Sequence, residues 1–70
     1  MDIRTKTQII IWKDYEFLVG YVIYSDETRW SSSPWDAWGT RNREQAWEVA
    51  EKVGGVPMLW NPIVGQMAIL

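Results

Sequence analysis

The side chains that could act as nucleophiles are gathered in one place, the run Ser31-Ser32-Ser33. A serine hydroxyl attacks only when a neighbouring base takes its proton, and histidine is the usual base. The chain contains no His. Lys13 or Lys52 could replace it in a Ser–Lys arrangement, but no such motif surrounds either lysine. Clustered serines are typical of hydrogen-bonded turns, and that is the interpretation we favour.

The acidic residues and glycines give no better sign of chemistry. Three glutamates fall on the solvated side of a predicted helix and form no catalytic pair. With neither Cys nor His, a metal would need oxygen ligands alone, and the acids lack EF-hand spacing. Gly54-Gly55 lacks the Lys-Ser/Thr that completes a phosphate-binding loop. We therefore predict no enzymatic activity, no metal site and no cofactor.

The most informative segment covers residues 29–43, RWSSSPWDAWGTRNR. It holds three of the six tryptophans and three of the seven basic residues. Trp and Arg are strongly enriched among the side chains that dominate binding energy. Such a segment indicates either a recognition surface or a tryptophan-filled core. The candidate binding residues are, in first place, Trp30, Trp35, Trp38, Arg41 and Arg43, and, in second place, Tyr15, Tyr21 and Tyr24.

Length and charge limit what these residues can do. A chain of 70 residues makes one small domain, which buries only about 60 % of the surface of its unfolded form. Without Cys it has no disulfide, so tryptophan burial is expected to supply much of the core. The net charge of −2 argues against a dedicated nucleic-acid binder. The first twelve residues contain only a four-residue apolar run, so we expect a soluble, cytoplasmic protein with no membrane segment.

Two apolar segments near the N-terminus predict a β-hairpin. Residues 7–13 (TQIIIWK) and 16–24 (EFLVGYVIY) are rich in β-branched and aromatic side chains, as strands are. The unbroken apolar centre of the first predicts a strand covered on both faces. Gly20 predicts a bulge, or a ring lying across the backbone. Asp14 and Tyr15 form the turn, and Arg29 begins a short third strand.

The clearest helix is predicted over residues 43–53. Asn42 is its N-cap, Gln45 lies where a capping box requires it, and Gly54-Gly55 end the helix. Upstream, residues 33–36 (SPWD) predict a single helical turn that Gly39 stops. The apolar face of the main helix has the i, i+3, i+4, i+7 spacing and consists of Ala46, Val49, Ala50 and Val53.

Two further strands are predicted after the helix, over residues 56–60 and 63–70. Pro57 lacks an N–H group, so either the strand over residues 56–60 lies at an edge of the sheet or Pro57 occupies its first position. The predicted fold class is α+β: a small antiparallel sheet of three to five strands with one α-helix packed on one face, in the order β-β-(β)-α-β-β. Residues 1–70 form a single domain.

The order of these signals resembles a pattern found in short uncharacterised proteins of bacteriophages and prophages. In that pattern a hairpin ends in a Trp-Ser step, and an aromatic residue leads to a capped helix, a Gly-Gly stop and a strand. The resemblance implies a protein that binds and inhibits a host protein, including defence systems. The chain departs from the pattern in its extra tryptophans and its second C-terminal strand. The residues that carry the resemblance are Trp30, Ser31, Trp38, Asn42, Ala46, Ala50, Gly54 and Gly55.

Three functions remain open at this stage. The first is a non-enzymatic protein that binds a host-derived protein through its aromatic and Arg-rich surface. The second is a single-stranded nucleic-acid binder that stacks bases on the same tryptophans and holds phosphates with the same arginines. The third is a structural homo-oligomer, with a homodimer joined through the apolar strand from Ile63 to Leu70. A rival to the first is that the rings form a second small core beneath the loop that carries Trp30 and Trp38.

Overall fold

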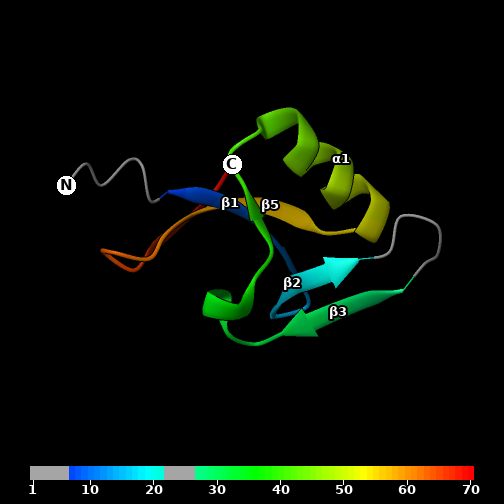
Figure 1. Cartoon of the computed structure of the whole chain (residues 1–70), viewed down its shortest axis with the longest axis horizontal. Helices are drawn as coiled ribbons and strands as arrows, with labels where there is room; N and C mark the ends of the chain where they lie inside the picture. Colours follow the sequence, from blue (N-terminus) through cyan, green and yellow to red (C-terminus); the bar gives the residue numbers. More distant parts are fainter. Residues whose placement is uncertain (1–6, 22–26) are drawn as a thin grey trace.

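The computed structural model describes residues 7–21 and 27–70. They form one antiparallel sheet with a single α-helix against it, which confirms the predicted α+β class. The described part has six strands, so the predicted count of three to five was too low. The elements are β1 (Gln8–Lys13), β2 (Glu16–Tyr21), β3 (Thr28–Ser31), the 3-10 helix η2 (Pro34–Asp36), β4 (Gly39–Thr40), α1 (Arg43–Val53), β5 (Val56–Asn61) and β6 (Gln66–Ile69). In Figure 1, α1 lies above the strands, and η2 lies at the lower left, beside the end of β3.

The central strand of the sheet is β1, and the strand order is β3-β2-β1-β5-β6. One side of β1 pairs with β5 along its length, from Gln8 opposite Trp60 to Trp12 opposite Val56. The other side is shared, because β4 pairs with its first half and β2 with its second. This position explains the apolar run in β1, since both of its faces are covered. The register shift between Leu18 and Gly20 confirms the predicted bulge.

The extra strand is β4, which has only two residues. Gly39 lies opposite Ile10, and the backbone N–H of Trp38 donates to the carbonyl oxygen of Leu18 at 2.8 Å. A side chain at Gly39 would meet the end of the Gln8 side chain, which would have to move to make room for it. Sequence periodicity cannot detect a two-residue strand. From the sequence, Gly39 was instead expected to be the residue that stops the preceding helical turn.

Both predicted helices are present; α1 has its predicted ends, whereas η2 ends at Asp36 with Ala37 as its C-cap, before Gly39. Ser33 caps η2 by accepting a hydrogen bond from the backbone N–H of Trp35. Asn42 caps α1 through its Oδ1, which accepts from the backbone N–H of Gln45 at 3.1 Å. Gln45 does not return the bond of a capping box. Its side chain instead accepts from the hydroxyl of Thr40, and that hydroxyl also accepts the N–H of Asn42.

The C-terminal hairpin differs from its prediction in two respects. β5 lies between β1 and β6 and is therefore not an edge strand, although Pro57 stands second in it. Proline fits at this position because the carbonyl oxygen of Pro57 accepts a hydrogen bond from the N–H of Leu70. The N–H and C=O of a strand residue point to the same neighbouring strand, so the N–H that Pro57 lacks would face β6, at the end of the ladder. The last strand is shorter than predicted, since Ile63 and Val64 belong to the turn. Gly65, with φ of +67°, completes that turn.

The sheet carries a separate apolar cluster on each face. On the α1 side, Ile11 and Leu18 pack against Val49, Ala50 and Val53 of the helix. On the opposite side, Ile10, Phe17 and Trp60 pack with Ala37 of the η2 segment. The second small core predicted beneath the loop is thus present only in part, because Trp12 packs against this cluster whereas Tyr21 packs on the α1 side and Tyr15 is exposed. Among the described residues, the η2 segment alone covers the face opposite α1.

Candidate binding face

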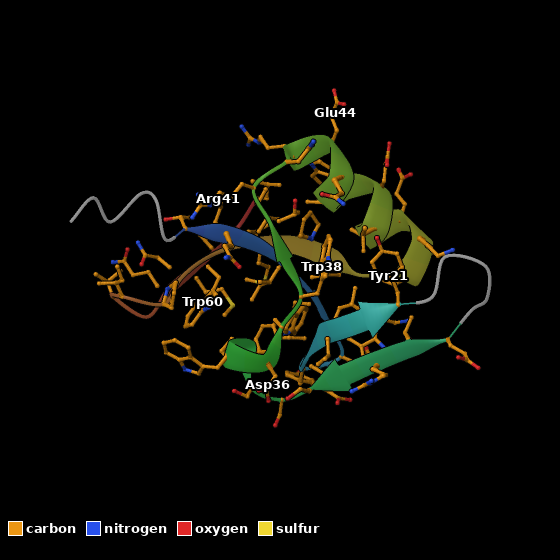
Figure 2. All side chains as sticks on the ribbon, viewed as in Figure 1. Tyr21, Asp36, Trp38, Arg41, Glu44 and Trp60 are labelled. Carbon is orange, nitrogen blue, oxygen red and sulfur yellow. The ribbon has the colours of Figure 1, made fainter. Side chains whose placement is uncertain are left out.

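Two of the predicted binding residues, Trp30 and Trp38, are half-buried against the helix-side core. The ring of Trp38 meets that of Tyr21 edge to face, with centroids 5.7 Å apart. Trp30 donates from its Nε1 to Thr28 and lies under the ammonium group of Lys13, 5.8 Å from the ring centroid. Figure 2 shows Trp38 and Tyr21 between α1 and β2. Packing against the core therefore buries part of each of these three rings, those of Trp30, Trp38 and Tyr21.

Two other predicted residues, Trp35 and Tyr15, are exposed. Trp35 is 68 % exposed and meets the ring of the buried Trp60 edge to face at 5.7 Å. Tyr15 is 85 % exposed and meets Trp12 in the same way at 5.8 Å. Both contacts lie on the sheet face opposite α1, since Trp12 and Trp60 both belong to the cluster on that face.

The predicted arginines do not lie with these rings. Arg41 and Arg43 are exposed next to the start of α1, whereas Trp35 belongs to η2. Figure 2 shows Arg41 and Glu44 close to the start of α1 and Asp36 of η2 at the other end of the molecule. Arg41 and Arg43 thus do not share a surface with Trp35, although Arg29 lines a hollow together with Trp30. Tyr24 lies outside the described residues.

The structure instead brings together a set of apolar side chains from β1, β5 and β6. In register, Trp12 lies opposite Val56, and Met58 lies opposite Ile69, all on the face opposite α1. These side chains line a groove of about 250 Å³, and no polar residue takes part in its lining. We call this groove and the neighbouring ring of Tyr15 the open face; its lining residues are Trp12, Val56, Met58, Met67 and Ile69.

Exposure on the open face is unusual for such apolar residues. Ile69 is 74 % exposed and Val56 is 37 % exposed, while Trp12, Met58 and Met67 are half-buried. Single exposed apolar residues are common on proteins, but a contiguous apolar patch marks an interaction surface. Met and aromatic side chains are also the types enriched at interfaces. Both the composition and the shape of the open face are therefore those of an interaction surface.

Charge is distributed in a way that isolates this face. No charged residue follows Lys52 in the sequence, so the whole hairpin of β5 and β6 is uncharged. The helix carries its charged side chains towards solvent, at Glu44, Glu48, Glu51 and Lys52. Charged residues are depleted at the centre of protein interfaces, because burying an unpaired charge is costly. The part of this face that β5 and β6 form is thus suited to burial, whereas the part near β3 and η2 carries Arg29 and Asp36.

The described residues offer little for other kinds of chemistry. No group of three or more acidic side chains among them is placed to hold a metal ion. Ser31 donates from its hydroxyl to Asp36 at 3.1 Å and accepts from the backbone N–H of Ser33, so the serine run acts locally as a turn. No helix in the part of the chain described is long and apolar enough to cross a membrane.

Sequence reasoning missed most of the open face. Only Tyr15 was among the candidate binding residues, because the search followed the density of Trp and Arg, although Met67 and Ile69 fall within the segment predicted to join a homodimer. The alternation of Val56, Met58 and Trp60 was a usable signal, since alternate residues of a strand share a face. What could not be seen was that η2 would cover only one end of that face.

Comparisons with protein-family models, curated proteins and solved structures return no match for this chain. The resemblance to phage and prophage proteins therefore stays a prediction. The open face rests on the geometry of this chain alone.

Proposed function

We propose that this protein is a small non-enzymatic binding protein that takes an apolar segment of a protein partner onto its open face. The observation that carries the proposal is the groove lined by Trp12, Val56, Met58, Met67 and Ile69. It lies on a sheet whose opposite face is already covered by α1. A sheet of this kind is stable with one face covered, so the second face is available to a partner.

The segment that best fits the open face is an amphipathic helix. On the other side of the same strands, the eleven residues of α1 cover β1 and β5 with one apolar stripe. A partner helix of similar length, about 16 Å, would span the same strands from the other side. The complex would then have a helix on each face of one sheet. Helix-in-groove recognition of this type depends on apolar residues three and four positions apart.

The conformation of Tyr15 supports the proposal independently. Asp14 and Tyr15 both have positive φ, at 50° and 67°, in the two-residue turn between β1 and β2. Such turns favour Asn-Gly or Asp-Gly, because a side chain is strained at positive φ. A tyrosine that is 85 % exposed gains little from burial in exchange for this strain. Its ring is well placed to contact a partner next to Trp12.

The test is a comparison of variants in capturing partners from an extract of the producing cells. The double variant Tyr15→Gly with Val56→Thr removes a ring and a methyl group from opposite sides of Trp12. Glycine suits the turn, and threonine keeps the β-branched shape, so the fold is expected to persist. The matched control is Trp47→Gln, which removes a half-exposed ring from α1.

We expect one protein to be retained by the original chain and by Trp47→Gln, and its affinity to fall about tenfold or more in the double variant. Circular dichroism on all three proteins establishes that each is folded. Equal retention by the double variant, or loss only in Trp47→Gln, would place binding elsewhere and contradict the proposal. So would the absence of any retained protein.

A further inference from the structure

The outer edge of β6 has backbone groups that pair with no described residue. The N–H of Leu70 donates to the carbonyl of Pro57 at 3.1 Å, which makes that pair a hydrogen-bonded one. Hydrogen-bonded and non-hydrogen-bonded pairs alternate along an antiparallel ladder. Ala68 and Gln66 therefore direct their backbone groups to β5. Met67 and Ile69 direct theirs outward, to the free edge.

This edge lacks the features that usually prevent strands from pairing between molecules. Proteins protect edge strands with charged side chains, proline, bulges or a covering element. β6 has the sequence QMAI, with neither charge nor proline, and its pairing with β5 is regular. The opposite edge, β3, contains Arg29 and follows Glu27, and its pairing with β2 contains the bulge. Of the two outer strands of the described sheet, β3 and β6, only β6 is thus unprotected.

We propose that the β6 edge pairs with β6 of a second copy of this chain, antiparallel, around a two-fold axis at Ala68. In this register Met67 faces Ile69 of the second copy, and Ile69 faces its Met67. Both are the residues with outward backbone groups, so each pair exchanges two hydrogen bonds. Ala68 faces its own counterpart across the axis. The side chain of Ala68 lines a hollow of about 550 Å³ beside the axis.

Charge favours a second copy over pairing through other surfaces. The chain carries a net charge of −2, so two copies repel each other unless they meet where charge is absent. The β5–β6 hairpin is that region, since no charged residue follows Lys52. A β6-to-β3 contact would instead bring Arg29 to an uncharged edge. It is also not self-complementary, so it would continue as an open filament or close into a ring and would not stop at a dimer.

The two-fold axis would stand perpendicular to the sheet, so both copies keep their faces on the same sides. The two helices would lie on one side of a continuous sheet, and the two open faces would adjoin on the other. Met67 and Ile69 line the groove and also flank the axis, so they would join the two grooves. The dimer would thereby present a doubled apolar face.

A four-residue strand pair buries less than the roughly 1,600 Å² of a standard stable interface, so the dimer should be weak. We expect a dissociation constant of about 0.1 mM. In analytical ultracentrifugation the average mass should rise from the 8.2 kDa of the monomer towards twice that value between about 10 µM and 1 mM. Over the same range, the amide protons of Met67 and Ile69 should become protected from exchange, while those at the edge of β3 should not.

The decisive variant is Ala68→Lys, with Ala68→Thr as its matched control. Ala68 is exposed and lies on the α1 side, so neither change alters the lining of the open face. Two lysines opposite each other at the axis should abolish the rise in mass, whereas two threonines pair well across strands and should keep it. Circular dichroism checks that both variants are folded.

A constant monomer mass up to 1 mM in the original chain would overturn the proposal. So would a dimer that Ala68→Lys leaves intact, or a mass that grows beyond the dimer. These outcomes are separate from the test of the open face, because the Tyr15 and Val56 variants leave the β6 edge unchanged. Loss of partner capture without loss of the dimer, or the reverse, would distinguish the two proposals.

Discussion

At the scale of single residues, the most informative position is Tyr15. It combines positive φ, an exposed ring and an edge-to-face contact with Trp12. A residue chosen for stability alone would be glycine, so the tyrosine indicates a role for the ring itself. Trp60, in contrast to Tyr15, is a buried ring. It is 8 % exposed and belongs to the core, although its sequence neighbourhood gives no sign of greater importance than the other tryptophans.

The backbone strain at Tyr15 can be measured with a pair of substitutions. Both Tyr15→Ala and Tyr15→Gly remove the ring, and they differ only in the backbone conformation they tolerate. Glycine accepts positive φ without cost, whereas alanine does not. We expect the free energy of unfolding to be about 1 kcal/mol higher for Tyr15→Gly than for Tyr15→Ala. Urea denaturation provides the measurement, and equal stabilities would show that the turn does not hold residue 15 at positive φ.

At the scale of elements, sequence reasoning succeeded where local chemistry decides the outcome. Both ends of α1 were predicted correctly, because Asn42 and Gly54 satisfy backbone groups that the helix itself leaves unpaired. Gly54 has φ of +73°, as a left-handed helix cap requires. Strand β4 was missed and β6 was overextended. Their limits depend on pairing partners distant in the sequence, Ile10 for Gly39 and Asn61 for Gln66.

The N-cap of α1 gives the clearest prediction at this scale. Asn42→Ala removes the oxygen that accepts the N–H of Gln45. We expect it to lower the free energy of unfolding by about 1 kcal/mol, while Asn42→Gly lowers it by only about a few tenths of that. Thermal unfolding followed by circular dichroism would measure the difference. If the alanine variant were as stable as the original chain, the hydrogen bonds of Thr40 alone would be sufficient to start the helix.

At the scale of the whole molecule, the central feature is the difference between the two faces of the sheet. The α1 side is closed by a helix with a charged outer surface, whereas on the other side, among the described residues, η2 covers one end of the sheet and leaves the apolar groove exposed. Sequence periodicity predicted a sheet with a helix on one face, but it could not show which residues the other face would leave exposed. That depends on where the residue 32–38 loop crosses the sheet, which is a property of the assembled fold.

The most direct test of the open face uses the methyl groups of its methionines. Met58 and Met67 both line the groove, and methionine methyl signals are well resolved in carbon–proton NMR spectra. When the captured partner is added, we expect both signals to shift, while the indole N–H signal of Trp47 on α1 stays in place. A partner that binds and shifts the Trp47 signal but neither methionine would contradict the account, since binding would then occur on the helix side.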